Sequence, residues 1–253
     1  MARKPLMGGN WKLNPTTTKE ATNLATEFAK LVKDNSQVDS VIFPPSPFMV
    51  PVYEKLEATN VAVGAQNCYF EDTGAYTGAV STCMVKDVGA TYVLCGHSER
   101  RTLFKDDDTA INKKVAKVLK EGLRPVLCIG ESQEEYEAGL NHEVCAIQLL
   151  KDLSYVSAED MVKVVIAYEP VWAIGTGLVC PAEVAQEVHA FIRSVIAKKY
   201  GQEIADQVII QYGGSVKPEN VKEIMAMPDI DGCLVGGASL TAESFSAICN
   251  FMN

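Results

Sequence analysis

The sequence predicts an α/β protein that folds as one (β/α)8 barrel over residues 1–253. Short β-rich segments alternate with amphipathic helices along the whole chain, and eight such units can be counted. A length near 250 residues is typical of a barrel that forms one domain. No linker, low-complexity stretch or abrupt change of composition divides the chain.

The predicted strands are short and apolar. Several are continuous runs of apolar residues, as expected for parallel strands that are buried on both faces. They cover residues 5–10, 38–43, 61–65, 92–96, 125–130, 164–168, 208–212 and 232–235.

The predicted helices lie between these strands. Apolar residues recur at helical spacing in the segments 24–32, 111–119 and 184–196. Pro181 suits the start of the last of these helices, and Gly201 suits its end. An open, doubly wound sheet is the structural alternative, but its first turn would usually carry a G-x-G-x-x-G pattern, whereas this chain has GGNWK.

Composition excludes several functional classes. A net charge of -9 disfavours binding to nucleic acid or to an anionic membrane. The N-terminus lacks the apolar run of a signal peptide, which predicts a cytoplasmic protein with reduced thiols. The eight cysteines form no Cys-x-x-Cys pair, so no metal site is expected and most should be small core side chains.

In a barrel, the loops that follow the carboxyl ends of the strands build the site. Asn10 and Lys12 follow the first strand, and both would point the same way if the chain stayed extended. His97 follows the fourth strand at a position that can open a short helix, where a neutral imidazole is favoured. A lone histidine is more often structural and a lone lysine is usually solvated. His142 and His189 lie in charged helical stretches and are interpreted as surface residues.

Glu169 follows the sixth strand. A carboxylate that leaves an apolar strand is partly desolvated, which raises its basicity, although a glutamate in a salt bridge at the barrel rim is an equal alternative. Gly175, Ser215, Gly236 and Gly237 offer backbone N–H groups in tight turns. Such turns after the seventh and eighth strands match the phosphate site that recurs in barrels, but glycine pairs alone are weak evidence.

Eight motifs, in order along the chain, resemble the triosephosphate isomerase family. They are GGNWK (8–12), GAQNC (64–68), GAYTG (74–78), GHSERR (96–101), CIGE (128–131), AYEPVWAIGTG (167–177), YGGS (212–215) and VGGASL (235–240). The resemblance implies a TIM barrel and an intramolecular aldose–ketose isomerase of glycolysis and gluconeogenesis. Such an enzyme interconverts dihydroxyacetone phosphate and D-glyceraldehyde 3-phosphate through an enediolate.

The resemblance also implies roles for single residues. Glu169 resembles the base that moves the proton between carbons, and His97 resembles the neutral electrophile that polarises the substrate oxygens. Lys12 would supply fixed positive charge, Asn10 would orient the substrate, and Glu99 would support the Lys12 side of the site. No metal and no cofactor is implied.

The same resemblance implies a closing lid over residues 170–180, with Gly175 donating its N–H to the phosphate. Ser215, Gly236 and Gly237 would complete the phosphate-binding site. Closing such a lid excludes water and holds the enediolate in the productive geometry.

Members of this family are usually homodimers in which a loop, here residues 67–79, enters the neighbour's site. Thr77 would contact Asn10 of the partner subunit, and Leu13 would lie in the socket that receives the loop. Two other sequence features depart from the family pattern. Ala79 replaces a glutamate that usually faces the arginine at Arg100, and the lid ends in LVC (178–180).

The residue Cys180 allows two interpretations. An exposed hinge thiol before a helix would be reactive, but a small apolar plug under the lid is the favoured interpretation. Two other functions also remain open at this point: another phosphate-binding barrel, such as an indole-glycerol-phosphate lyase or synthase, and an inactive barrel kept as a binding protein. The first would lack the set Asn10, Lys12, His97 and Glu169, and the second would show damage there.

Overall fold

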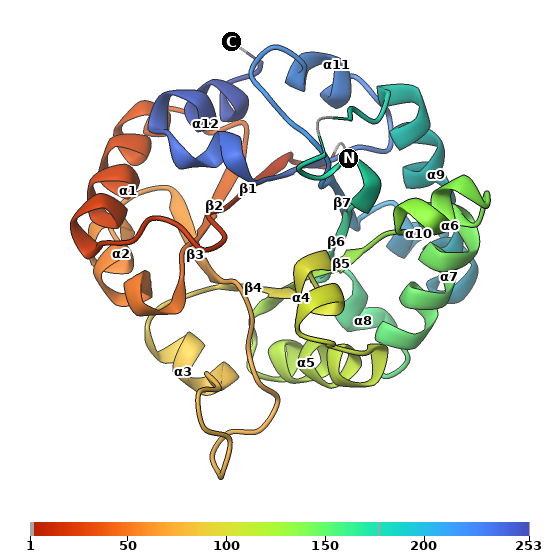
Figure 1. Cartoon of the computed structure of the whole chain (residues 1–253), viewed down its shortest axis with the longest axis horizontal. Helices are drawn as coiled ribbons and strands as arrows, with labels where there is room; N and C mark the ends of the chain where they lie inside the picture. Colours follow the sequence, from red (N-terminus) through yellow and green to blue (C-terminus); the bar gives the residue numbers. More distant parts are fainter. Residues whose placement is uncertain (1–2, 177, 253) are drawn as a thin grey trace.

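Eight parallel strands close into a barrel in the computed structural model, which describes residues 3–176 and 178–252 (Figure 1). The strands pair in chain order, and β8 returns to pair with β1. They are β1 (Leu6–Asn10), β2 (Asp39–Phe43), β3 (Val61–Ala65), β4 (Tyr92–Cys95), β5 (Arg124–Ile129), β6 (Val165–Tyr168), β7 (Ile209–Tyr212) and β8 (Gly232–Val235). The predicted fold class is therefore confirmed.

Most predicted strand bounds differ from the observed bounds by one residue, while β3 and β8 match. The predicted fourth and fifth strands each included a glycine at the end, Gly96 and Gly130. Gly96 has φ +74, which takes the chain out of the extended conformation directly before His97. The strand therefore ends where the candidate site begins.

A ring of helices surrounds the barrel (Figure 1). The α-helices in the described residues are α1 (Thr18–Val32), α2 (Met49–Leu56), α3 (Thr82–Asp87), α4 (Ser98–Leu103), α5 (Asp108–Lys120), α6 (Gln133–Glu137), α7 (Asn141–Asp152), α8 (Ala158–Met161), α9 (Ala182–Tyr200), α10 (Gln202–Ala205), α11 (Val221–Met225) and α12 (Ala242–Cys249). Short 3-10 helices are η1 (Ser46–Phe48), η2 (Val171–Ala173) and η3 (Gly237–Leu240). None of the helices in the described segments is long and apolar enough to cross a membrane.

The core has two layers because successive strand residues point to opposite faces. Leu6 joins the cluster inside the barrel, whereas its neighbour Met7 joins the larger cluster between the strands and the helices. Gly8 points inward, where a Cβ would lie 3.0 Å from Leu234. The interior is thus filled with side chains, and the open space lies at the strand ends.

Helix α9 shows both of its predicted signals. Pro181 lies directly before its first residue and Gly201 directly after its last, so the helix begins one residue later than Pro181 itself. The helix has one apolar stripe that packs on the barrel, formed by residues such as Ala185, Ile192 and Ile196.

The prediction that His189 lies on the surface is wrong. The side chain is fully buried, and its Nδ1 lies 3.2 Å from the carbonyl oxygen of Asp229. Burial lowers the pKa of His189 to about 3, so the ring is neutral. The reason is its place on α9, on the stripe that faces the barrel. His142 is half-buried and stacks on Phe191.

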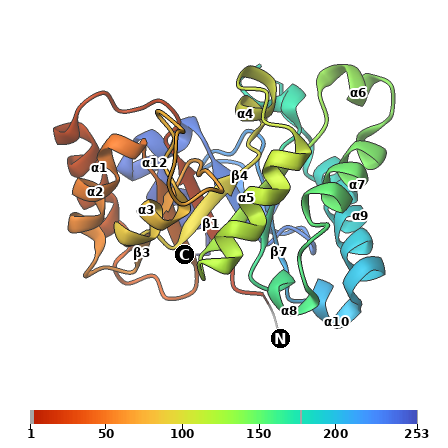
Figure 2. The same cartoon turned by 90° about the horizontal axis from the view of Figure 1, so that it is seen from below.

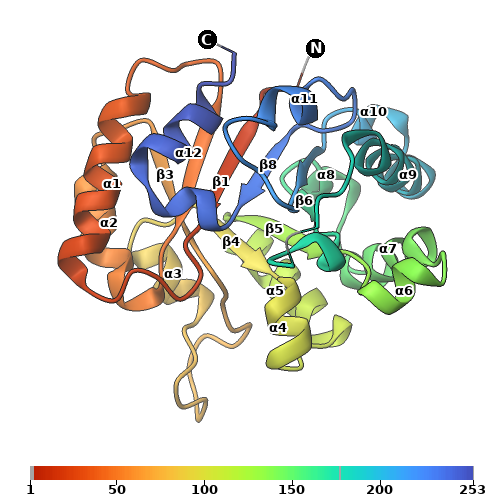
Figure 3. The same cartoon turned by 45° about the horizontal axis from the view of Figure 1, so that its top comes forward.

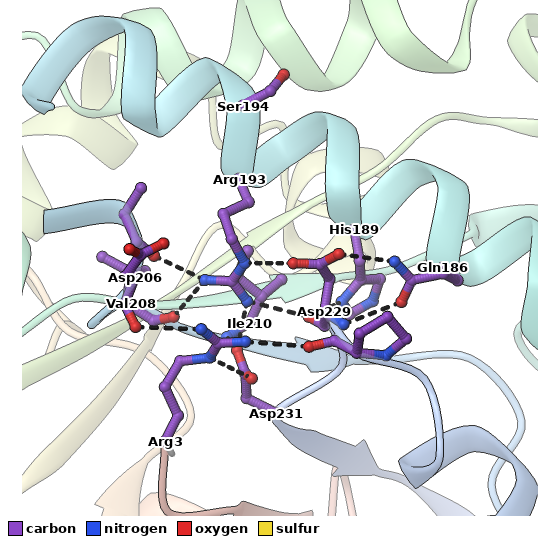
Figure 4. Close-up of polar contacts among 12 residues, drawn as sticks. Arg3, Gln186, His189, Arg193, Ser194, Asp206, Val208, Ile210, Asp229 and Asp231 are labelled. Carbon is purple, nitrogen blue, oxygen red and sulfur yellow. Dashed lines mark hydrogen bonds and ion pairs between the residues drawn. The ribbon is translucent and has the colours of Figure 1, made fainter. Parts of the chain in front are cut away.

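His189 borders an ion-pair network at the end of the barrel where the strands begin (Figure 4). Arg193 pairs with Asp229 at 2.6 Å and with Asp231 at 2.7 Å, and Arg3 pairs with Asp231 at 2.5 Å. The network ties α9 to the segments that lead into β1 and β8. Figure 2 shows α8 and α10 at this end, away from α4. Polar groups at this end of a barrel serve stability rather than chemistry.

Candidate active site

One cavity of about 710 Å³ opens at the carboxyl ends of the strands. Its lining includes eight of the predicted site residues: Asn10, Lys12, His97, Glu169, Gly175, Ser215, Gly236 and Gly237. Glu99 lines the neighbouring cavity of about 630 Å³ instead. The structure therefore brings together, at one end of the barrel, residues from β1, β4, β6, β7 and β8.

Asn10 and Lys12 both line the cavity, but the backbone conformation between them differs from the predicted one. Lys12 has φ +53, so the chain does not stay extended after β1. The backbone N–H of Lys12 donates to Oδ1 of Asn10 at 3.0 Å, which locks the amide side chain against the turn. The expected extended geometry is wrong, although both side chains do line the cavity.

The ammonium group of Lys12 is held at the rim of the cavity. Its Nζ lies 2.7 Å from Oε1 of Glu99, which comes from α4. The aliphatic end of the same side chain lies beside Gly236, where a Cβ would be 3.3 Å from Cε of Lys12. A positive charge is thus fixed between Glu99 and the glycine turn after β8.

His97 and Glu169 are in direct contact. Nε2 of His97 lies 3.0 Å from Oε1 of Glu169, and the backbone N–H of Ser98 donates to Oε2 at 2.8 Å. Nδ1 of His97 accepts the backbone N–H of Glu99 at 3.2 Å, at the start of α4. Because Nδ1 accepts, the ring proton is on Nε2, and His97 donates it toward Glu169.

The pKa directions in this resting pair differ from those the sequence predicted. Burial raises the pKa of Glu169, but the His97 contact and the Ser98 N–H outweigh it, and the net shift is downward. Burial lowers the pKa of His97, but the Glu169 carboxylate outweighs it, and the net shift is upward. Each shift depends on the partner. If the carboxylate leaves the ring, each group loses its main opposing interaction, so burial makes the carboxylate more basic and the imidazole less so.

Two groups that contact Glu169 were missed by the sequence analysis. One is the Ser98 N–H, and the other is Gly213, where a Cβ would lie 2.8 Å from Cγ of Glu169. Both lie inside motifs that were noted for other reasons. The sequence signal that could have identified them was their position, because each follows the end of a strand that lies close to β6 in the barrel.

The loop formed by residues 67–79 projects from the barrel between β3 and α3 (Figure 3). Thr77 is exposed, and Leu13 is 89% exposed. Arg100 pairs with Asp106 in the same chain at 2.7 Å and lies over the ring of Phe104. Its charge is therefore satisfied without a carboxylate at position 79.

Cys180 is buried, and burial raises the pKa of its thiol to about 12. The interpretation of Cys180 as an exposed, reactive thiol is therefore wrong, and its interpretation as a small apolar side chain agrees with the structure.

The one group of metal-type ligands found in the described residues is Asp72, Cys83 and Glu121. Lys117 Nζ lies 2.6 Å from Asp72 and 2.7 Å from Glu121, so a lysine already supplies the cation there.

The fold and the cavity define a class: barrel proteins in which a carboxylate, an imidazole, an ammonium group and glycine turns share one site. Comparison with known proteins then narrows the class. The triosephosphate isomerase family model matches residues 5–252. A triosephosphate isomerase of Carboxydothermus hydrogenoformans is 53% identical over 97% of this chain and 98% of its own length. That of Alkaliphilus oremlandii is 51% identical over 98% of this chain and all of its own length, and that of Finegoldia magna is 48% identical over 98% and 99%.

The chain belongs to the triosephosphate isomerase family. It is therefore an isomerase that interconverts dihydroxyacetone phosphate and glyceraldehyde 3-phosphate, and the glycolytic role follows from the family. The alternative of an indole-glycerol-phosphate barrel is set aside by this match.

Proposed function

We propose that Glu169 and His97 carry the proton transfers of this isomerisation and that Lys12 and Asn10 hold the substrate between them. The observation that carries the proposal is the contact of Nε2 of His97 with the Glu169 carboxylate on the floor of the cavity, with Lys12 at its rim. A base, a proton donor and a cation therefore border the same space, which a small phosphorylated sugar can fill.

The reaction would proceed in two proton transfers at carbon. The Glu169 carboxylate takes a proton from C1 of dihydroxyacetone phosphate, and the C–H electron pair forms the C1–C2 double bond of the enediolate. The C2 carbonyl electrons move to its oxygen, which the Nε2–H of His97 and the Lys12 charge stabilise. Glu169 then returns the proton to C2 while a proton passes from O1 to O2 through His97, which gives glyceraldehyde 3-phosphate.

Substrate binding would also prepare the base. A substrate oxygen that replaces the carboxylate at Nε2 of His97 separates the resting pair. The separation removes the largest interaction that lowers the Glu169 pKa and the largest that raises the His97 pKa, and burial then favours a stronger base and a neutral imidazole. The resting contact thus holds both groups in place without fixing their working basicity.

The phosphate would lie against the backbone N–H groups of Gly175, Ser215, Gly236 and Gly237. These four residues line the cavity, and Lys12 lies beside Gly236. Residues 170–180 would close over the phosphate as a lid; residue 177 of this segment lies outside the described residues. Since the chain's own groups supply base, acid and cation, we expect turnover to persist after dialysis against a chelator.

We further propose a cytoplasmic homodimer whose single domain spans residues 1–253. In this dimer Thr77 contacts Asn10 of the partner, and Leu13, which is nearly fully exposed, lies in the socket for the partner's loop. The projecting loop and the free thiols support this proposal. Turnover measured against protein concentration, together with sedimentation, tests the assembly.

The assignment of the base is tested with Glu169→Asp. The shorter side chain withdraws the carboxylate by one methylene, and a misplacement on the order of 1 Å can cost about 100-fold in rate. In an assay that couples glyceraldehyde 3-phosphate to a dehydrogenase, kcat should fall by about that factor with little change in KM. Near-normal turnover would remove Glu169 from the role of base.

A further inference from the structure

We infer that Gln148 is a positioning residue for Glu169 and acts through the backbone of Gly130. Gln148 lies on α7, outside the barrel, and does not line the substrate cavity. Its amide makes two hydrogen bonds to one residue: Oε1 accepts the Gly130 N–H at 2.8 Å, and Nε2 donates to the Gly130 carbonyl at 3.3 Å. Both polar ends of the side chain are therefore used on the residue that follows β5.

Gly130 lies directly against the backbone of Glu169. A Cβ at Gly130 would overlap the carbonyl oxygen of Glu169, so only glycine allows this approach. The N–H of Glu169 donates to the carbonyl of Ile129 at 2.7 Å, which joins the two segments one residue earlier. A shift of the Gly130 peptide groups is therefore passed to the Cα of Glu169, from which the carboxylate projects.

Gln148 supplies the hydrogen-bond partners of the Gly130 backbone. The carbonyl groups of Ile129 and Glu131 on either side accept the N–H groups of Glu169 at 2.7 Å and of Val171 at 3.1 Å. The β5–β6 ladder ends at the pair Ile129 and Tyr168, and Gly130 is outside the strand. Without Gln148, both polar groups of the Gly130 backbone would lose their protein partners, and the Gly130 peptide groups could shift against Glu169. An error on the order of 1 Å in the base is enough to cost about 100-fold in rate.

Water can reach the two hydrogen bonds between Gln148 and Gly130, which we call the clamp, through a second cavity. Gly130 and Gln148 line a separate cavity of about 190 Å³, together with Ser98, Arg101 and Glu169. A carboxyl group introduced at position 148 could therefore exchange protons with solvent. This access allows a test in which the clamp is broken and restored within one protein preparation.

The test compares Gln148→Met and Gln148→Glu with wild type. Methionine keeps the length of the side chain but removes both hydrogen bonds, so kcat should fall about 10- to 100-fold while KM stays within about 2-fold. A glutamate behaves differently in its two states. The carboxylate accepts the Gly130 N–H but repels its carbonyl, whereas the protonated acid can accept and donate as the amide does.

The ratio of the kcat of Gln148→Glu to that of wild type should therefore rise as the pH falls from 8 toward 5.5, because protonation rebuilds the clamp. The corresponding ratio for Gln148→Met should stay flat. Gln207→Glu and Gln207→Met are matched controls, because Gln207 is exposed and donates only to the Glu203 carbonyl at 3.0 Å. If Gln148 served stability alone, both of its variants would have lower melting temperatures, but the ratio of the kcat of Gln148→Glu to that of wild type would not depend on pH.

The inference rests on the proposed role of Glu169 as base, and the two can fail separately. A kcat of Gln148→Met within 2-fold of wild type, or a Gln148→Glu ratio that does not change with pH, overturns the positioning role. If Glu169→Asp turns over normally, the base assignment fails instead. If the kcat of Glu169→Asp falls while the Gln148 variants turn over like wild type, only the role of Gln148 is refuted.

Discussion

Replacing Lys12 by methionine should remove most of the activity while leaving the fold intact. The Nζ of Lys12 is fixed by Glu99 at 2.7 Å and lies beside the Gly236 turn, on the side of the cavity where the phosphate is proposed to bind. From there it can approach an enediolate oxygen to about 4 Å, where a charge pair near a protein surface is worth about 4 kcal/mol. Since each 1.4 kcal/mol is a factor of ten, kcat/KM should fall by about 10³-fold.

Methionine is a matched substitution for this purpose. It is similar in length to lysine and has no charge, and at φ +53 it experiences the same backbone strain. The Lys12–Glu99 pair is partly exposed, and such pairs contribute about 0–1 kcal/mol to stability. The free energy of unfolding should therefore change by no more than about 1 kcal/mol.

The assay is steady-state turnover in both directions, with urea unfolding of each variant. Lys12→Arg keeps the charge and should retain more activity than Lys12→Met, whereas Lys55→Met removes an exposed lysine on α2 and should match wild type. Activity of Lys12→Met within a few-fold of wild type would show that the charge is not needed. A variant that unfolds several kcal/mol more easily would show instead that Lys12 is structural.

Three further predictions concern assembly, thiols and acid stability. Ala79→Glu should leave the dimer unchanged or slightly tighter in sedimentation, because Arg100 already has a carboxylate partner; a clearly weaker dimer would contradict this. A bulky thiol reagent at neutral pH should label Cys83, which is half-exposed, before Cys180; peptide mapping that finds the reverse order would refute it. The folded-state pKa of His189 is about 3, against about 6.5 unfolded, so its contribution to stability is complete above pH 6.5 and is lost as the pH falls. Between pH 6.5 and 5 this amounts to about 2 kcal/mol, and His189→Gln should not show that loss in urea unfolding.

The strands could be predicted from the sequence because parallel strands buried on both faces leave a plain signal of continuous apolar runs. The surface assignment of His189 failed for a reason that helical spacing could have corrected. It lies four residues after Ala185 and three before Ile192, and both of these are buried. Its charged neighbour Glu187 is exposed, whereas Arg193, four residues after His189, is buried with it, so local composition was misleading.

The electrostatics of the site could not be predicted, because they depend on contacts between distant parts of the chain. Ser98 and Glu169 are 71 residues apart, yet a hydrogen bond of 2.8 Å joins them. Burial of Glu169 was correctly expected, but its pKa is set by His97, whose distance the sequence does not contain. The conformation of Lys12 was equally hidden, since a positive φ in a non-glycine residue has no sequence signal here.

The register of the barrel explains why glycines flank the proposed base. Ile129 pairs with Tyr168, and Tyr168 pairs with Tyr212, so these three residues form one row across β5, β6 and β7. The first residue after each strand is Gly130, Glu169 or Gly213, and a Cβ at either glycine would collide with Glu169. Sequence analysis that treated each strand end alone placed Gly130 at the end of its strand and Gly213 in the segment after the seventh strand, with no link to Glu169. Aligned by register, they instead form the space that the glutamate occupies, and any side chain there would move the carboxylate away from His97.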